Sequence, residues 1–359
     1  MANTGPARSE FVVVASVLLC VWGCSHREIG SHVEIAGEPN LRVEATELDR
    51  TVVTPCFGTE IPEGKNVLWC NTFQLAWNEL CDLLGEEALA QFDSPTIAAL
   101  NKGPATKDEL DDPSYVAIAG QGPGVLAEIR RELRRKFYGA ALPELLSEPG
   151  LGDMEWIAYA YLFKHLPFEW AFTRFEYPMN FDDTEVAAFG IDQYLKDQDD
   201  EVKMAGQVVV HDYQAPDDFI IELKTRSEGD RLVLARVPPA ETLAETVAGV
   251  RRRVSQGQPT GMREAEDLAV PVFDFDILRR YPEVCPPCQI AAQSIRFRLD
   301  ETGAVLKSEA VAAGGEARSF RFDGPFLILL ERKDAKNPYF ALWVANAELM
   351  VGFQRAADG

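Results

Sequence analysis

The sequence has few histidines and few basic residues, and these shortages exclude several functions. Among 359 residues there are 4 His, and 35 Lys and Arg stand against 57 Asp and Glu, for a formal net charge of -22. Such a charge repels nucleic-acid phosphates, so we predict no nucleic-acid partner. His26, His32, His165 and His211 include no pair at metal-ligand spacing, so we predict no metal site.

The motifs of several common enzyme classes are also missing. The sequence contains no H-E-x-x-H, no G-x-S-x-G, and no G-x-G-x-x-G after a predicted strand. Acidic stretches such as Asp182 and Asp183, or DQDDE at 197–201, fall in segments that we expect to be solvated loops. We therefore predict no cofactor, and we do not predict an enzyme.

The one long apolar run lies near the N-terminus and is typical of an export signal. Residues 11–23, FVVVASVLLCVWG, follow Arg8 and are too few to span a bilayer as a helix. Cys24 follows in VWGCS, which resembles the bacterial lipoprotein cleavage box, with Trp22 where a small residue is usual. We predict a signal peptide at 1–24 with lipid on Cys24; an ordinary cleaved signal or an uncleaved anchor is the alternative.

An exported protein is expected outside the cell, in the periplasm, or anchored to a bacterial membrane through the lipid on Cys24. The polar residues 25–62 are then expected to form a tether and an irregular lead-in to a single domain at 63–359. Five cysteines follow Cys24, an odd number, so at least one has no partner within the chain: Cys56, Cys70, Cys81, Cys285 and Cys288.

The motif CPPC at 285–288 allows more than one interpretation. We favour a local structural disulfide between Cys285 and Cys288, or two unpaired thiols. A thiol oxidoreductase is a distant alternative, because no βαβ unit surrounds the motif.

Helical periodicity is concentrated in the N-terminal half of the domain. KNVLWC at 65–70 predicts a strand, and TFQLAWNELCDLLG at 72–85 predicts a helix ended by Gly85. Residues 86–122 are predicted as a short helix followed by loops. A second helix begins at 125, and its basic face predicts either a polyanion or acidic-partner site or an ordinary solvated surface. That face carries Arg130, Arg131, Arg134 and Arg135.

Strand patterns dominate from residue 154 onward. MEWIAYAYLF at 154–163 is apolar enough for the middle of a sheet, and further strands are predicted at 206–213, 217–225, 230–238, 293–300 and 326–345, the last being a hairpin. Residues 241–254 predict a helix. EDLAVPVFDFDI at 266–277 predicts one strand whose Pro places it at an edge or bulge. The class is α+β, a large mixed sheet with further sheets and abbreviated helices.

Several blocks occur in the order found in one known family. They are KNVLWCNTFQLAWNEL at 65–80, IAYAYLFKHLPFEWAF at 157–172, VPVF at 270–273, FRLDETG at 297–303, AVLKSEAVAAGGE at 304–316, FDGPFLILL at 322–330 and YFALWVA at 339–345. Taken together they resemble the serpins. The resemblance implies a serpin fold and inhibition of a serine or cysteine endopeptidase, which cuts an exposed loop whose hinge end then inserts into the main sheet.

The resemblance also assigns roles to residues at the end of the loop. It implies a hinge at Glu301, Gly303, Ala304 and Leu306, a reactive loop at 304–321, and a scissile bond near Ala317, Arg318 and Ser319. Cleavage between Arg318 and Ser319 would suit a trypsin-like protease. Two counts of the loop length, one from each end, place the scissile position near Ala317 and near Gly314.

Alternation within the loop permits insertion. One face carries Ala304, Leu306, Ser308, Ala310, Ala312 and Gly314, whereas Lys307 and Glu309 share the other. The polar cluster beneath the serpin sheet corresponds by position to Cys70, Phe73, Tyr159 and Gln293, none of them the family's residue. This departure supports the alternative of a serpin-fold lipoprotein that binds a partner or ligand and no longer inhibits.

Overall fold

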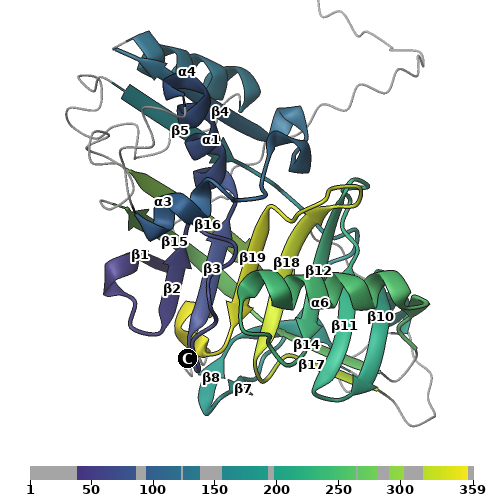
Figure 1. Ribbon diagram of the computed structural model, residues 1–359. Coiled ribbons are helices and arrows are strands. Elements are labelled where there is room, and N and C mark those ends of the chain that lie inside the picture. The colour runs from purple at the N-terminus through teal and green to yellow at the C-terminus, as the bar shows by residue number, and fades with distance from the viewer. Residues whose placement is uncertain are drawn as a thin grey trace, which may run out of the picture. The chain divides into compact units, whose positions relative to one another are not determined.

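Several β-sheets and a few helices make up the described part of the chain, which confirms the predicted α+β class (Figure 1). The computed structural model describes residues 39–85, 94–122, 124–137, 156–192, 198–263, 266–281, 291–302 and 318–354. None of the helices in these ranges has the length and apolar character needed to cross a membrane.

The largest sheet has eight strands and is mixed. Its order is β13 (Thr260–Gly261), β10 (Val208–Ala215), β11 (Asp218–Leu223), β12 (Asp230–Arg236), β18 (Phe326–Arg332), β19 (Phe340–Val344), β3 (Asn66–Cys70) and β2 (Thr51–Thr54). Only β2 and β3 run parallel. Because side chains alternate across a strand, Ile220 and Val233 face helix α6 (Leu243–Gln256), and Ile221 and Leu234 face the main core.

A four-stranded sheet lies in the order β17 (Ser319–Arg321), β14 (Asp267–Pro271), β9 (Ala188–Ile191), β6 (Thr173–Arg174). The single strand predicted at 266–277 is in fact two strands, because Pro271 ends β14 and the chain continues as β15 (Phe273–Arg280) in another sheet. Proline lacks the N–H needed to extend the ladder, so it marks a change of sheet here. The prediction of an edge position was wrong, since β14 lies between β17 and β9.

Two smaller sheets contact helix α1 (Thr72–Leu84). One is β1 (Leu41–Glu44), β15 and β16 (Ala292–Leu299), and the other is the pair β4 (Tyr115–Gln121) and β5 (Trp156–Leu162). Helix α1 contacts β4, β5 and β16. Its predicted end is confirmed at Gly85, whose φ of 77° favours glycine.

Three segments differ from their sequence-based predictions. Strand β4 occupies residues predicted as loop, and β5, predicted for the middle of a sheet, pairs with β4 alone among the described residues. Strands β1 and β2 belong to sheets although they lie in the segment 25–62. The strand β4 was missed because Ala, Gly and Gln interrupt its apolar alternation.

The remaining described elements are three helices, a hairpin and four single turns. They are α3 (Pro95–Leu100), α4 (Gly124–Lys136), α5 (Gln198–Gly206), the hairpin of β7 (Met179–Phe181) and β8 (Thr184–Val186), and the single 3₁₀ turns Ala45–Glu47, Lys107–Glu109, Asp112–Ser114 and Ala347–Leu349. Helix α4 packs on β4 and β5 through a small cluster that includes Ile129 and Leu133. The larger core lies between the main sheet and the three- and four-stranded sheets.

Candidate functional site at the ends of segment 303–317

The predicted hinge and the predicted scissile bond lie at opposite edges of the four-stranded sheet. Strand β16 leads to Thr302 beside β6, where the Phe172 amide donates to the Glu301 carbonyl at 3.1 Å. Arg318 leads into β17 at the other edge. Strands lie about 5 Å apart, so the span is about 15 Å, whereas residues 303–317 can reach about 50 Å when extended. The chain between the two ends is therefore much longer than the span requires.

Only some of the predicted site residues lie in the described ranges. Glu301, Arg318 and Ser319 are described, and each is placed below. The others lie outside the described residues: Gly303, Ala304, Leu306, Ala317, Cys24, Cys285 and Cys288.

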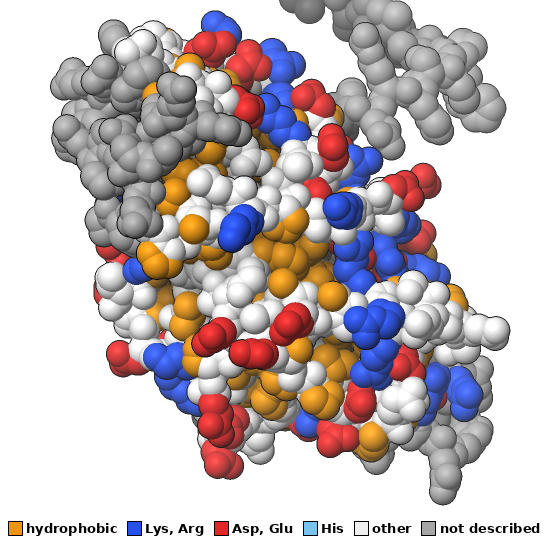
Figure 2. Space-filling model, viewed as in Figure 1, with side chains coloured by type: hydrophobic (Ala, Val, Ile, Leu, Met, Phe, Trp, Pro, Cys, Tyr) orange, Lys and Arg blue, Asp and Glu red, His pale blue; other side chains and the backbone are white. Residues whose placement is uncertain are grey.

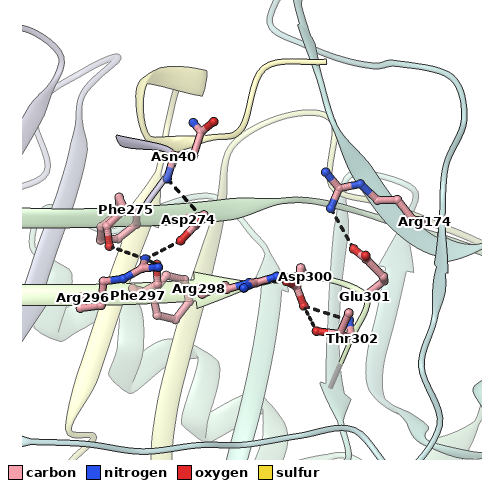
Figure 3. A network of polar contacts seen from close by, with 10 residues as sticks. All are labelled: Asn40, Arg174, Asp274, Phe275, Arg296, Phe297, Arg298, Asp300, Glu301 and Thr302. Atoms are coloured by element: carbon pink, nitrogen blue, oxygen red, sulfur yellow. Dashed lines mark hydrogen bonds and ion pairs between the residues drawn. The ribbon is translucent and has the colours of Figure 1, made fainter. Parts of the chain in front are cut away.

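Asp300 organises the hinge end of the segment (Figure 3). One of its carboxylate oxygens accepts from the Thr302 amide at 2.9 Å and from the Thr302 hydroxyl at 2.6 Å, and the other pairs with Arg298. Burial favours a higher pKa for this carboxyl, but the bonds from Thr302 and the charge of Arg298 outweigh it, and the pKa lies below the ordinary value of 3.8. The turn that leaves β16 is thus held by an ionised carboxylate.

Glu301 is tied to the neighbouring sheet. Its Oε2 lies 2.8 Å from Arg174 NH1 on β6, and its carbonyl accepts from Phe172. The two side chains are 22% and 39% exposed, so the pair is worth about 1 kcal/mol or less. The predicted hinge residue is therefore held by contacts that can be broken at small cost.

Arg318 lies at the other end in a much more enclosed setting. Its Nε is 2.6 Å from Glu266 Oε1 and its NH2 is 2.9 Å from Glu266 Oε2, a two-pronged pair. The Arg318 side chain is 16% exposed and that of Glu266 is 1% exposed. Tyr213 and Phe320 present their rings to the guanidinium at 5.7 and 5.3 Å.

Ser319 is already part of a paired strand. It is the partner of Asp267 in the parallel ladder of β17 and β14, and its hydroxyl donates to Asp267 Oδ2 at 3.1 Å. A protease needs extended, accessible backbone on both sides of the bond it cuts. Ser319, which is paired in the ladder, does not offer such a backbone in this structure.

A buried polar cluster joins β16 to the start of α1. Gln293 Nε2 donates to the Cys70 carbonyl at 3.0 Å and to Thr72 Oγ1 at 2.8 Å, and Tyr281 OH donates to Gln293 Oε1 at 3.1 Å. Phe73 stacks at a tilt on the Tyr281 ring at 4.4 Å. The structure thus brings together three of the four residues predicted here, and adds Thr72 and Tyr281.

Sequence reasoning missed Thr72 and Tyr281 and misplaced Tyr159. Thr72 begins a predicted helix, a position at which a hydroxyl is ordinary, and Tyr281 closes a strand whose end was not predicted. Tyr159 packs with Ile129 and Leu133 on the α4 side of β5, away from Gln293, and burial raises the pKa of its hydroxyl. A shift of one residue exchanges the two faces of a strand, and Ala158 faces the α1 side instead.

The basic face of α4 is largely paired with acids. Arg131 lies 3.2 Å from Glu128 and Arg135 lies 2.7 Å from Glu132, each one turn away. Arg130 is half-buried, and Arg134 is exposed. Figure 2 shows acidic and basic side chains intermingled at the top of the view, where α4 lies in Figure 1. This arrangement favours the ordinary solvated surface over a polyanion site.

The described ranges hold three free thiols and no cluster of metal ligands. Cys56, Cys70 and Cys81 are free thiols, and burial raises the pKa of each. Within the same ranges, no three His, Cys, Asp or Glu side chains are grouped so as to hold a metal ion.

Comparison with known proteins finds similarity among solved structures. No family model matches the chain, and no curated protein matches its sequence. One similar structure is Serpin48 of the insect Tenebrio molitor, described as a highly specific serpin, with 13% identity over 78% of this chain and 91% of that one, at a TM-score of 0.42. Another is SRPN18 from Anopheles gambiae, with 9% identity over 80% and 93%, at a TM-score of 0.49.

Both similarities are to serpin structures, at TM-scores below 0.5. In the structure itself β14, β16, β17 and the β18–β19 hairpin follow one another in the predicted order, with the segment 303–317 between β16 and β17. These elements lie in or beside the blocks on which the resemblance rests, and the mixed sheets with few helices confirm the α+β class predicted from the sequence.

Proposed function

We propose that this chain is an exported serpin-type inhibitor of serine or cysteine endopeptidases, which acts through cleavage and insertion of the segment 303–317. The observation that carries the proposal is the edge of β16. Strand β16 pairs with β15 on one side, and no described residue pairs with it on the other. A strand edge with unpaired N–H and C=O groups is a template for a further strand.

The position of this edge suits the segment that follows it. The chain leaves β16 at Leu299 and turns at Asp300–Thr302, so the residues after the turn are the nearest available strand. Helix α1 contacts both β16 and β5, and β5 also has one side that no described residue pairs. An added strand would therefore lie over α1 between two open edges.

Side-chain alternation supports the same proposal. On β16 the buried residues are Gln293, Ile295, Phe297 and Leu299, and the residues between them point outward. An added strand would likewise bury every second residue. The set containing Ala304 and Leu306 is free of charge, whereas Lys307 and Glu309 would face solvent. A charge on the buried set would cost several kcal/mol.

A second candidate function is a non-inhibitory serpin-fold protein that acts as a binding or structural module. The buried Gln293 cluster favours it, because sliding β16 over α1 would break the two hydrogen bonds from Gln293 to Cys70 and Thr72. The two candidates differ in whether the sheet accepts the segment.

Incubation with proteases separates the two candidates. The full chain is mixed with a trypsin-like, an elastase-like and a papain-like enzyme, and the products are examined on SDS gels and by thermal melting. An SDS-stable complex supports inhibition. Cleavage with a large rise in melting temperature shows that the sheet accepts the segment although no protease is trapped, and it contradicts the second candidate as well as inhibition of that protease. Cleavage with neither outcome contradicts insertion and supports the second candidate.

A pair of neighbouring variants gives the matched control. Leu306→Asp places a charge on the set that would be buried, and Lys307→Asp places the same charge on the set that would face solvent. We expect both variants to fold, and only Leu306→Asp to lose the complex or the rise in melting temperature. Equal behaviour of the two variants would show that the assignment of faces is wrong.

Export and lipid attachment at Cys24 are part of the proposal and have their own test. The support is the apolar run at 11–23 followed by VWGCS. Mass spectrometry of the mature protein from a bacterial host should find Cys24 at the N-terminus with a diacylglyceryl adduct. A mature chain that begins elsewhere would contradict the lipoprotein assignment.

A further inference from the structure

We propose that Arg318 fixes the C-terminal end of the loop to the sheets beside it and is not presented to a protease; we call Arg318 the anchor. Its pairing with Glu266 makes the Arg318–Ser319 bond resistant to trypsin-like enzymes. The resistance of this bond follows from the packing of described residues alone. A second consequence, the class of protease that the loop would engage, rests on the proposed function.

The pairing has the geometry of a fixed contact. Both carboxylate oxygens of Glu266 accept from Arg318, at 2.6 and 2.9 Å, and Oε2 also accepts from the Arg263 amide at 2.7 Å. The planar guanidinium matches a carboxylate in this two-pronged arrangement, which Lys does not reproduce. Glu266 is held at its own end as well, so the carboxylate is not free to follow Arg318 outward.

Two aromatic rings, one from β17 and one from β10, lie against the guanidinium. Phe320 lies two residues along β17, and Tyr213 comes from β10 in the eight-stranded sheet. The two rings meet edge to face with their centroids 5.3 Å apart, and the Gly261 carbonyl on β13 accepts a further bond from Arg318 NH2 at 3.4 Å. Arg318 thus joins the four-stranded sheet to the edge of the eight-stranded sheet.

Cleavage after Arg318 would require all of these contacts to break. A trypsin-like enzyme takes the arginine side chain into a pocket that ends in Asp, so the side chain must first leave Glu266. The residue after the bond must leave the β14 ladder and Asp267. Removing one partner of a buried pair leaves an uncompensated charge, so this release is strongly unfavourable.

The anchor also limits the class of protease that the loop would engage, provided that the proposed function holds. Residues 308–317 contain no Lys or Arg and consist of Ala, Gly, Val, Ser and Glu. Because the paired Arg318 is not available to a protease, a cut between Lys307 and the start of β17 falls mostly after small residues. Proteases with a small specificity pocket, as in elastase, suit such a bond, and trypsin-like enzymes do not.

The test is timed digestion of the native full chain with trypsin, with the cut bonds identified by mass spectrometry. In the parent protein we expect cleavage after Arg318 to be at least a hundredfold slower than in Glu266→Gln, which removes the charge that holds the guanidinium. Glu301→Gln is the matched control, because it makes the same substitution at the other end of the loop. That variant should leave the Arg318–Ser319 bond as slow as in the parent.

Digestion also reports whether the variant is folded. An unfolded chain would be cut at Arg231 and Arg236 within β12, whereas release of the anchor alone exposes only the bond after Arg318. If Glu266→Gln does not fold, digestion of the parent protein alone still tests the proposal. Prompt cleavage of the parent's Arg318–Ser319 bond would overturn it. The cleavage map does not depend on inhibition: a resistant bond with no trapped protease contradicts the proposed function and leaves the anchor standing.

Discussion

Replacement of Gln293 by leucine tests the contact that holds β16 on α1. Gln293 is 4% exposed, and its amide makes hydrogen bonds with the Cys70 carbonyl, Thr72 Oγ1 and Tyr281 OH. Leucine has a similar volume and removes the amide without creating a large cavity. The effect of Gln293→Leu should therefore report the hydrogen bonds rather than lost packing.

The size of the effect follows from the groups left behind. Three buried polar groups lose a partner, and each costs about 1–3 kcal/mol when it has none. The Thr72 hydroxyl keeps a weak contact with Cys70 Sγ at 3.6 Å, and leucine avoids the cost of burying an amide. We expect the free energy of unfolding to fall by about 3 kcal/mol, a change that lowers the melting temperature of a large domain by about 5–10 °C.

Thermal melting and urea titration of purified protein measure this change. Ser294→Ala is the control, since the adjacent Ser294 points outward and makes one exposed hydrogen bond to Asp276 at 3.2 Å. We expect the control to change stability by less than about 0.5 kcal/mol. If Gln293→Leu melts within 1 °C of the parent, a limit of about 0.5 kcal/mol by the same scaling, the cluster does not hold β16 to α1.

Three further outcomes are expected. The pKa of Asp300 in the folded protein lies below its ordinary value, so its ionised form stabilises the fold above about pH 4 and this effect is lost as the pH falls through the folded pKa. The difference in melting temperature between the parent and Asp300→Asn should therefore shrink toward pH 2. A difference that persists at pH 2 would contradict an ionised Asp300. Burial, with the charge of Asp82, raises the pKa of the Cys81 thiol to about 11, so iodoacetamide at pH 8 should alkylate it at least tenfold more slowly than a free thiol in solution, whereas an equal rate would contradict its burial. A Cβ on Gly190 would lie 1.8 Å from the Leu268 carbonyl oxygen, so Gly190→Ala should cost more than about 3 kcal/mol, while Gly206→Ala, with no atom within 4 Å, should be tolerated.

Local patterns were sufficient for many of the elements. The strands at β10, β11, β12 and β16 and the helices α1 and α6 were predicted because alternation and the helical stripe are visible within a few residues. Strand β4 was missed because its composition is mixed, and the strand at 266–277 was not divided because sequence alone does not show which sheet a strand joins.

The candidate site was predicted less completely than the fold. Glu301 lies in the turn that leaves β16, and Cys70, Phe73 and Gln293 lie together. Tyr159 was assigned to the same cluster but lies on the opposite face of β5, because a count along the chain that is wrong by one residue exchanges the two faces.

The sequence by itself determined the class of the fold, the order of its segments and the small, alternating character of residues 304–314, because composition and periodicity are properties of neighbouring residues. Only the tertiary structure decided which side chain Arg318 pairs with. An arginine after a run of small residues resembles a cleavage site, but Glu266 lies 52 positions away in the chain and 2.6 Å away in space. A long-range pairing of this kind has no local pattern in the sequence, and the proposal that Arg318 is an anchor rests on it.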